Sequence, residues 1–225
     1  MLVAGLDGCR AGWTAVLLKD GQFAEAGLFP RAEDVLTRWD DVVVVAIDIP
    51  IGLPDASTSY LRAADAAAKA FLGPAGASVF PTLPREVLEA PDFQTALALS
   101  RELFGKGISK QSYALAAKIL EVDEFAKSER SVHEVHPEVS FRAMPGGPKL
   151  YSKKSWNGLM QRKQRLRSQG IEVPEELGQA GGAGPDDVLD AAAAAWSGVR
   201  IATGRSRTLP DTALATTGRT IAIHY

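Results

Sequence analysis

The sequence predicts an α/β fold in which a mixed sheet is flanked by helices, and three observations support it. Strand-like segments lie at 2–7, 13–18 and 22–29, and the KDG turn between the last two favours a hairpin. The run 42–49 is apolar without polar alternation, which is typical of a central strand covered on both faces. Much of the remaining chain has helical patterning, which indicates helices that cover the sheet.

The other elements follow from periodicity and from capping signals. Helices are predicted over 31–39, 57–72, 92–104, 109–127, 155–169 and 185–202, and strands over 132–135 and 219–224. The proline-rich residues 73–91 and the glycine-rich residues 170–185 are expected to be connections. We therefore expect a single domain over 1–225 with a mostly helical insertion at about 55–130.

Composition excludes some classes of protein. The 225 residues carry a net charge of −2 and are 46% hydrophobic, which is enough for a full core and gives no overall attraction to nucleic acid. Cys9 is the single cysteine, so an internal disulfide and a cysteine zinc cluster are excluded. The N-terminus lacks a signal-peptide pattern, and no apolar run approaches the roughly 20 residues that span a bilayer. We expect a soluble cytoplasmic protein with no membrane partner.

Asp48 is the unusual residue of the apolar run 42–49. An unpaired carboxylate costs several kcal/mol, on the order of magnitude for buried charges, when it leaves water. Three interpretations are open. Asp48 caps the next segment, pairs with a buried cation, or holds a metal ion or a substrate at the carboxyl end of the strand.

Other acids also occur in unusual contexts. Asp7 ends the first predicted strand before a glycine, where an Asx-turn is the alternative to a functional site. Glu134 lies in the predicted strand 132–135, and Glu138 follows at a strand spacing that lets both share a face with His136. Solvent exposure on an edge strand is the alternative for these two glutamates.

The last predicted helix adds an acidic pair, Asp187 and Asp190, which are neighbours on its surface. The positive end of the helix dipole is a sufficient reason for Asp186 and Asp187 in the first turn, but it explains Asp190 less well because Asp190 lies among apolar residues. Taken together, the strand acids and the helix acids are what a two-metal site requires. Mg²⁺ and Mn²⁺ prefer oxygen ligands, and the metal offsets the repulsion among carboxylates.

Positive charge is concentrated in one segment. Residues 139–171 contain no acid and eight basic residues, namely Arg142, Lys149, Lys153, Lys154, Arg162, Lys163, Arg165 and Arg167. This segment is either a phosphate-binding face, with Trp156 available to stack on a base, or a solvated basic helix. Lys153 and Lys154 are the best candidates to reach a substrate phosphate.

The helix predicted over 57–72 carries Arg62, Asp65 and Lys69 on one face. A ladder of surface ion pairs is the simplest interpretation. The functional alternative is that Arg62 and Asp65 bind and position a substrate near Asp48. His136 is a candidate proton shuttle, although a strand histidine beside a proline is more often structural.

Two sets of motifs carry a resemblance to known families. The order of elements, with "GLDG", "VAIDIP" and "DVLDA", resembles the RNase H-like superfamily, especially Holliday-junction resolvases of the RuvC type. More narrowly, "GLDGCRAGW", "AIDIPIGLP", "RAADAAAK", "EVHPEVSF", "SKKSWNG" and "DDVLDA" look like domain-of-unknown-function family 429, whose members are predicted RNase H-like nucleases. The motifs occur in the same order over roughly residues 3–203.

The resemblance implies a fold, a site and an activity. The implied fold is an RNase H-like sheet with three antiparallel strands followed by parallel strands. The implied metal ligands are Asp7, Asp48 and Glu134, completed from the helix by Asp187 and Asp190, and the expected cofactor is Mg²⁺ or Mn²⁺. The expected activity is hydrolysis of a phosphodiester in DNA or RNA, so nucleic acid is the expected partner.

Other functions remain open at this stage. The chain could be a catalytically silent module of the same fold that binds nucleic acid or a nucleotide. An actin-like phosphotransferase would require two glycine-rich phosphate loops, and the sequence offers GLDGCRAG but no convincing second loop. A small phosphate ester is a further candidate substrate, which the long insertion would select.

Overall fold

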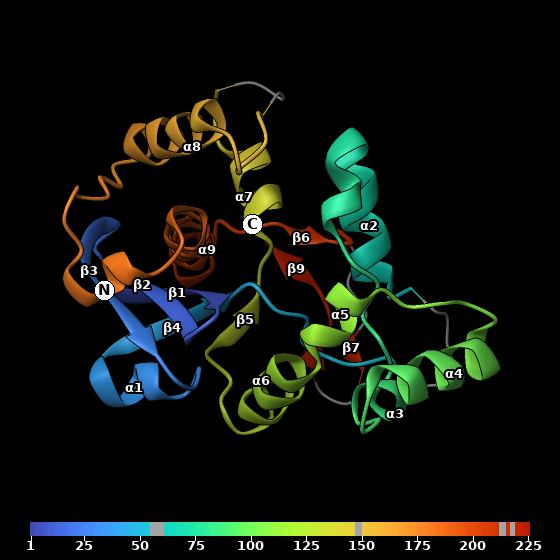
Figure 1. Ribbon diagram of the computed structural model, residues 1–225. Coiled ribbons are helices and arrows are strands. Elements are labelled where there is room, and N and C mark those ends of the chain that lie inside the picture. The colour runs from blue at the N-terminus through green and yellow to red at the C-terminus, as the bar shows by residue number, and fades with distance from the viewer. Residues whose placement is uncertain (55–60, 147–149, 212–214, 217–218) are drawn as a thin grey trace.

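The computed structural model describes residues 1–54, 61–146, 150–211, 215–216 and 219–225 (Figure 1). In these residues the main sheet has the strand order β3-β2-β1-β4-β5. Its strands are β1 (Leu2–Cys9), β2 (Gly12–Lys19), β3 (Gln22–Phe29), β4 (Val42–Ile47) and β5 (Val132–Glu134). The first three strands form an antiparallel meander, and β4 and β5 continue the sheet in parallel with β1. The expected mixed α/β fold is therefore confirmed.

One face of the sheet is covered by α9 (Pro185–Ala202), which packs across β1, β2 and β4. The alanines from Ala191 to Ala195 are fully buried in this contact. Gly5 allows the close approach, because a Cβ at this position would lie 2.1 Å from the backbone nitrogen of Ala195. Helices α7 (Pro137–Ala143) and α8 (Trp156–Ser168) pack on α9 as an outer layer (Figure 1).

The opposite face of the sheet carries a larger apolar cluster. Leu6 and Ile47 belong to it, and they pack with residues of α1 (Asp34–Arg38) and α6 (Ala116–Ser128). Side chains of a strand alternate between the two faces, so that Val3 lies toward α9 and Leu6 lies toward α6. This alternation decides which acids can meet at the strand ends.

The segment between β4 and β5 is mostly helical over its described residues and extends beyond the sheet (Figure 1). It consists of α2 (Ala63–Leu72), the 3-10 helix η1 (Gly73–Ser78), α3 (Arg85–Leu88), α4 (Phe93–Phe104), α5 (Lys110–Ala114) and α6. Later in the chain lie η2 (Gly178–Gly182), β6 (Thr208–Leu209), β7 (Ala215–Thr216), β8 (Arg219–Thr220) and β9 (Ile223–His224). Strand β6 pairs with β9, and β7 pairs with β8.

Several boundaries differ from those expected. The helix predicted over 109–127 is two helices that meet at Leu115, and residues 73–91 contain η1 and α3 as well as loop. The tail predicted as one strand over 219–224 contains the short strands β8 and β9 instead. The expected start of a helix at 57 lies outside the described residues. None of the helices in the described ranges is both long enough and apolar enough to cross a membrane.

The contact between Gly5 and α9 makes the first prediction. We expect Gly5→Ala to lower the free energy of unfolding by at least about 3 kcal/mol, because the new methyl group would collide with helix backbone that cannot move aside cheaply. Gly182→Ala is the control, since a Cβ there would meet nothing within 4 Å. Denaturant unfolding measures both variants, and a loss below about 1 kcal/mol for Gly5→Ala would contradict the packing described.

Candidate functional site

Asp7 and Asp48 lie side by side at the ends of neighbouring strands. Strands β1 and β4 pair in parallel, with Gly5 opposite Ala46 and Leu6 opposite Ile47. The backbone nitrogen of Asp48 continues this pairing by donating to the carbonyl oxygen of Leu6 at 2.9 Å. Since side chains alternate along a strand, both carboxylates project on the face that α9 covers.

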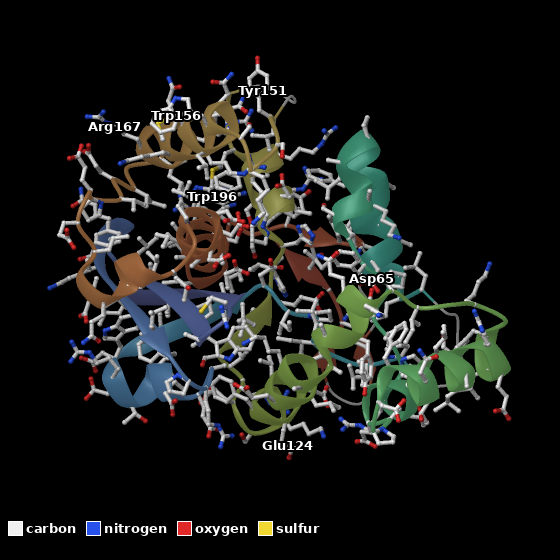
Figure 2. The ribbon with its side chains drawn as sticks, viewed as in Figure 1. Asp65, Glu124, Tyr151, Trp156, Arg167 and Trp196 are labelled. Carbon is white, nitrogen blue, oxygen red and sulfur yellow. The ribbon has the colours of Figure 1, made fainter. Side chains whose placement is uncertain are left out.

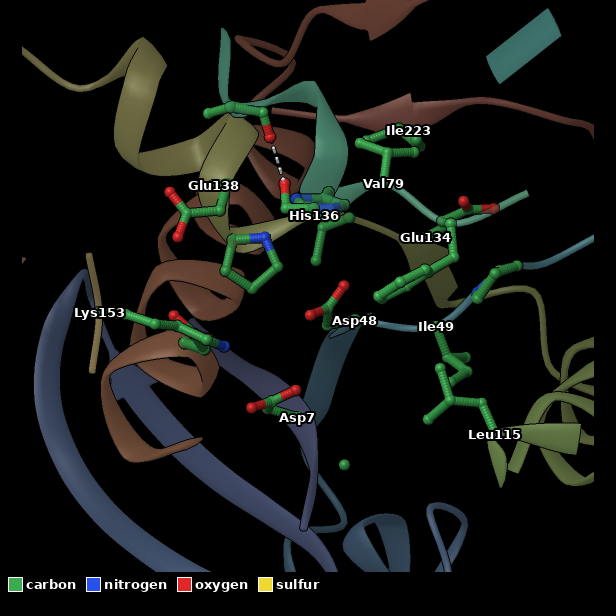
Figure 3. Close-up of a pocket in the computed structure, with 18 of the residues that line it drawn as sticks. Asp7, Asp48, Ile49, Val79, Leu115, Glu134, His136, Glu138, Lys153 and Ile223 are labelled. Atoms are coloured by element: carbon green, nitrogen blue, oxygen red, sulfur yellow. Dashed lines mark hydrogen bonds and ion pairs between the residues drawn. The ribbon is translucent and has the colours of Figure 1, made fainter. Parts of the chain in front are cut away.

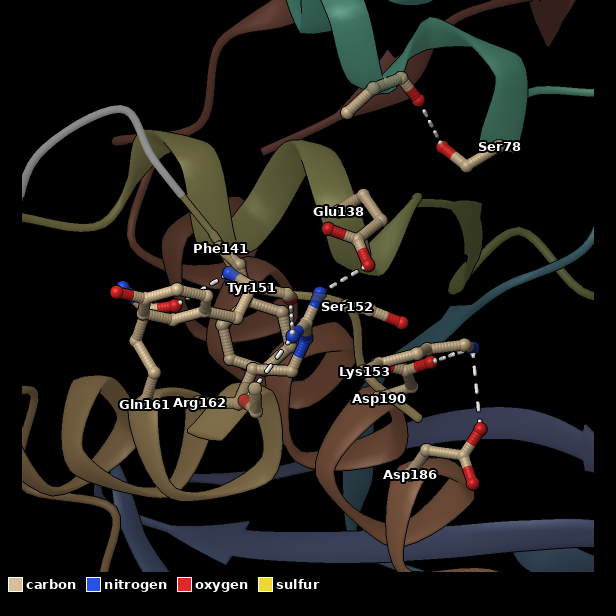
Figure 4. Close-up of polar contacts among 12 residues, drawn as sticks. Ser78, Glu138, Phe141, Tyr151, Ser152, Lys153, Gln161, Arg162, Asp186 and Asp190 are labelled. Atoms are coloured by element: carbon tan, nitrogen blue, oxygen red, sulfur yellow. Dashed lines mark hydrogen bonds and ion pairs between the residues drawn. The ribbon is translucent and has the colours of Figure 1, made fainter. Parts of the chain in front are cut away.

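Helix α9 brings a third carboxylate to these strand ends. Asp190 is 2% exposed and is turned toward the sheet by the close packing of the alanines that follow it. Lys153 reaches it from the segment before α8, with its Nζ 2.5 Å from Asp190 Oδ2 and 3.7 Å from Asp186 Oδ2 (Figure 4). Lys154 donates to the same oxygen of Asp186 at 2.6 Å. The two lysines therefore tie the 150–155 segment to α9.

A cavity of about 500 Å³ lies over these acids. Its walls come from the ends of β1 and β4, from η1 and α5 of the insertion, from the start of α7 and from the 150–153 segment. Asp7, Asp48, Asp190 and Lys153 all line it. Figure 3 shows the carboxylates of Asp7 and Asp48 and the ammonium of Lys153 directed toward the same space.

The three carboxyl groups have strongly perturbed acidity. Burial raises the pKa of Asp7 well above its usual value, and the charges of Asp48 and Asp190 raise it further. Burial also raises the pKa of Asp48 to about 7 and the pKa of Asp190 to about 6, although Lys153 lowers both. A carboxyl group that titrates near neutral pH has the acidity expected of a general base or of a ligand awaiting a cation.

Lys153 stays positively charged. Burial lowers the pKa of Lys153, but the charge of Asp190 and the hydrogen bond to it outweigh burial, so this pKa lies above its usual range. A permanently protonated amine cannot accept a proton. It can neutralise a carboxylate or hold a phosphate oxygen.

The oxygen atoms of the acids are only partly used. Asp190 Oδ1 is buried and has no hydrogen-bond partner. The carboxylates of Asp7 and Asp48 accept no hydrogen bond from the residues that the structure describes. As the side chains lie, the described ranges contain no group of three or more His, Cys, Asp or Glu side chains that could hold a metal ion. Among the described residues, Lys153 is a positive charge that acts on all three acids.

Glu134 lies in a different environment, a buried ion-pair network with Arg62. Nη2 of Arg62 is 2.7 Å from Glu134 Oε1, and Nη1 is 3.0 Å from Oε2. Oε2 also accepts the backbone N–H of Ile51 at 2.7 Å. Arg62 binds Asp65 at 2.6 Å as well, and Asp65 accepts the backbone N–H of Thr82 at 3.0 Å. The expected surface ladder is therefore wrong, because Arg62 and Asp65 are buried.

The strand register explains why Glu134 is separated from Asp48. Glu134 pairs with Ile47, so it projects on the face of the α6 cluster, whereas Asp48 projects toward α9. Glu134 still lines the edge of the cavity, but both of its oxygens are engaged by Arg62 and Ile51. Its role as a metal ligand stays a prediction, and the contacts around it favour a structural role.

The segment after Glu134 corrects another expectation. Pro137 begins α7, so Glu138 lies in a helical turn and the strand spacing that related it to Glu134 and His136 does not apply. Glu138 forms an ion pair with Arg162 of α8. Burial lowers the pKa of His136, which keeps its imidazole neutral near pH 7, and its Nδ1 is buried without a hydrogen-bond partner.

Asp187 does not line the cavity. Its Oδ2 accepts the backbone N–H of Gly184 at 3.2 Å, which caps the start of α9. Asp186, one residue earlier, lies one helical turn from Asp190 and shares Lys153 with it. Asp186, which the dipole argument treated as structural, is thus the helix acid next to Asp190.

The basic segment divides into two groups. Arg162 is 1% exposed and donates to the carbonyl oxygen of Tyr151, while Arg165 is 4% exposed and donates to that of Phe141. Trp156 is 73% exposed, and Figure 2 shows it and Arg167 projecting outward from α8. Neither of these two lines the cavity. Sequence reasoning missed the buried role of Arg162, since its partner Glu138 is 24 residues away.

These features define a mixed α/β protein with an acidic cavity at the ends of two parallel strands. The family model described as protein of unknown function (DUF429) matches residues 5–215. The match covers most of the chain, so the chain belongs to this family. Searches among curated proteins and among solved structures found no match.

The raised pKa of Asp48 predicts a pH dependence of stability. A carboxyl group whose pKa is near 7 in the folded state and near its ordinary value of 3.8 in the unfolded state favours folding at low pH. That contribution is complete below about pH 4 and is lost as the pH rises to about 7. We expect Asp48→Asn, measured in a chelator, to gain about 1 to 2 kcal/mol over the wild type between pH 4 and pH 8.

Denaturant unfolding at several pH values tests this expectation. Asp41→Asn is the control, because Asp41 is exposed and does not line the cavity. A difference between wild type and Asp48→Asn that is flat from pH 4 to pH 8 would contradict the environment described for Asp48.

The network around Arg62 makes a separate prediction. Glu134→Ala should lower the free energy of unfolding by about 3 to 5 kcal/mol in the absence of any metal, because it leaves a buried guanidinium with one partner fewer. Glu124→Ala, which removes an exposed carboxylate paired with Lys127, should change it by less than about 0.5 kcal/mol. A small effect of Glu134→Ala without metal would instead favour Glu134 as a ligand.

Proposed function

We propose that this protein is a divalent-metal-dependent phosphodiester hydrolase with an RNase H-like fold that acts on nucleic acid. One observation carries the proposal. Carboxylates from the ends of β1 and β4 and from α9 converge on one cavity, where they repel one another and where part of their oxygen atoms has no partner. Bringing these carboxylates together lowers the stability of the fold, and a bound cation or substrate would offset that loss.

The sheet supports the fold assignment. An antiparallel meander followed by parallel strands, in the order β3-β2-β1-β4-β5, agrees with the arrangement that the sequence motifs imply. The acids stand at the ends of its first and fourth strands, at Asp7 and Asp48. Nucleic acid as partner, and Mg²⁺ or Mn²⁺ as cofactor, rest on this likeness together with the chemistry of the cavity.

The chemistry of the lining acids suits a hard divalent cation. Asp7, Asp48 and Asp190 supply carboxylate oxygens, which Mg²⁺ and Mn²⁺ prefer. The unpartnered Oδ1 of Asp190 is available to a cation, while its Oδ2 is bound to Lys153. Lys153 already neutralises Asp190, so a cation held by Asp7, Asp48 and Asp190 would take over part of that neutralisation.

When bound, the cation would supply a Lewis acid that activates water and stabilises the leaving oxygen. The chain's own residues have distinct tasks in the reaction. Asp7, Asp48 and Asp190 would hold the cation, and the ammonium of Lys153 would donate to a nonbridging phosphate oxygen. The oxygen of water forms a bond to phosphorus, the bond from phosphorus to the leaving oxygen breaks, and that oxygen takes up a proton. Neutral His136 lines the cavity and is the candidate to carry the proton released by water.

A second function is favoured by the Lys153 contact. Since the ammonium of Lys153 already balances Asp190, the chain could bind a phosphate-containing ligand without cleaving it. Such a silent binding module needs no metal, and it predicts binding that survives loss of the acids. The two functions therefore differ in their response to the same substitutions.

Calorimetric titration of Mn²⁺ tests the proposal. We expect Mn²⁺ to bind and thermally stabilise the wild type, and Asp7→Asn and Asp48→Asn each to weaken binding at least about tenfold, because each removes a charged ligand. Asp41→Asn is the matched control and should bind like the wild type. Cleavage of labelled DNA and RNA with Mn²⁺ is measured on the same variants. If both site variants bound Mn²⁺ and cleaved as the wild type does, the proposal would be wrong.

A further inference from the structure

The cavity has two chemically different sides. Lys153 and Glu138 lie on one side of Asp48 in Figure 3, and the apolar side chains Val79, Leu115 and Ile223 lie on the other, together with Glu134, which is paired with Arg62. The apolar side is built by η1, by the junction between α5 and α6, and by β9, which all lie outside the main sheet. A ligand that fills this space must combine an anionic group with an apolar one.

Positive charge is scarce in the cavity, which suits it to one phosphate at most. Among the lining residues that the structure describes, the basic side chains are Lys153 and Arg162. Arg162 is held by Glu138 and by backbone carbonyl oxygens, so Lys153, which is paired with Asp190, is the lining cation left to meet an anion. A strand that passes through a site as an extended chain requires a cation for many of its phosphates. The exposed Arg167 lies on the outer surface of α8 and does not supply a cation to the cavity (Figure 2).

The apolar side is suited to a nucleobase. Phe80 is a half-buried ring in the lining, and aromatic and aliphatic side chains stack on the faces of bases without regard to sequence. Gln111 of α5 also lines the cavity, one helical turn before Leu115. Its amide can both donate to and accept from the edge of a base.

The volume agrees with one such unit. A cavity of about 500 Å³ falls within the roughly 300 to 1,000 Å³ of sites that enclose a small ligand. Two polar atoms of the lining, Nδ1 of His136 and Oδ1 of Asp190, are buried and unpartnered, so groups are available for a ligand to use. Residues of the insertion line the cavity together with the acids, so a ligand that fills it contacts both.

We propose that this cavity binds one nucleotide unit, with its phosphate at Lys153 and the acids and its base against the insertion. This inference rests on the proposed function and specifies its substrate. The unit is either the terminal nucleotide of a single strand or a free nucleotide, since both present one phosphate and one base.

Binding is tested first, and without catalysis. Adenosine 5′-monophosphate is titrated calorimetrically into the wild type, with and without Ca²⁺ as a cation that supports binding. We expect one nucleotide per chain and at least about tenfold weaker binding by Leu115→Trp, because the larger side chain fills the apolar side. Ala117→Trp is the control, since Ala117 is an exposed residue of α6 that does not line the cavity. Equal binding by wild type and Leu115→Trp, or no binding by the wild type, would overturn the inference.

The two sources of the nucleotide are separated with three substrates in Mn²⁺. These are a linear labelled single strand, a closed circular single strand of similar composition, and adenosine 5′-monophosphate. Release of mononucleotides from the linear strand alone supports the strand end, and release of inorganic phosphate from the monophosphate alone supports the free nucleotide. Cleavage of the circle would overturn the inference while supporting a metal-dependent nuclease. Binding of the monophosphate with no cleavage of any substrate would support the inference and count against the proposed hydrolase.

Discussion

The close contact between α9 and the sheet is the constraint on which the rest of the structure depends. Small residues on both partners, Gly5 on β1 and the alanines 191–195 on α9, let the helix backbone approach the strand directly. This approach fixes the rotation of the helix, so Asp190 lies over the ends of β1 and β4, where Asp7 and Asp48 project to the same face. A helix held farther away by larger side chains would leave three separate acids in place of one acidic cavity.

Bringing these acids together creates electrostatic repulsion, which the molecule offsets in two ways. Lys153 and Lys154 neutralise the acids of α9 from a segment outside the sheet. Glu134 is instead neutralised by Arg62, in a network that also satisfies the backbone of the loop that follows Asp48. The carboxylate of Glu134 is thus fully paired, whereas the carboxylates of Asp7 and Asp48 accept no hydrogen bond from the described residues. Under the proposed function, the unpaired acids are the groups that would meet a cation or a substrate.

Much of the architecture could be predicted from short patterns. The apolar run 42–49, the KDG turn and the proline at the start of the last helix placed β4, the β2–β3 hairpin and α9 correctly. The positions of Asp7 and Asp48 followed, because both end strands. The relation of Glu134 to these acids could not be predicted, since it depends on the register between β4 and β5, and a shift of one residue exchanges the two faces. The partners of Arg62 and Arg162 were equally inaccessible, because Arg62 meets a residue 72 positions away and Arg162 one 24 positions away.

The pairing of Arg62 with Glu134 joins the insertion to the sheet through buried charge. Arg62 immediately precedes α2, the first helix described in the insertion, whereas Glu134 ends β5, and the same guanidinium binds the carbonyl oxygens of Ile51 and Gly52. Separating the insertion from the sheet would leave the charges of Arg62 and Glu134 without their partners. The helical insertion therefore cannot open as an independent unit at low cost in free energy. The wall of the cavity therefore shares the cooperativity of the core. Evolution can vary the apolar residues on that wall without breaking the ion pairs that tie the wall to the sheet.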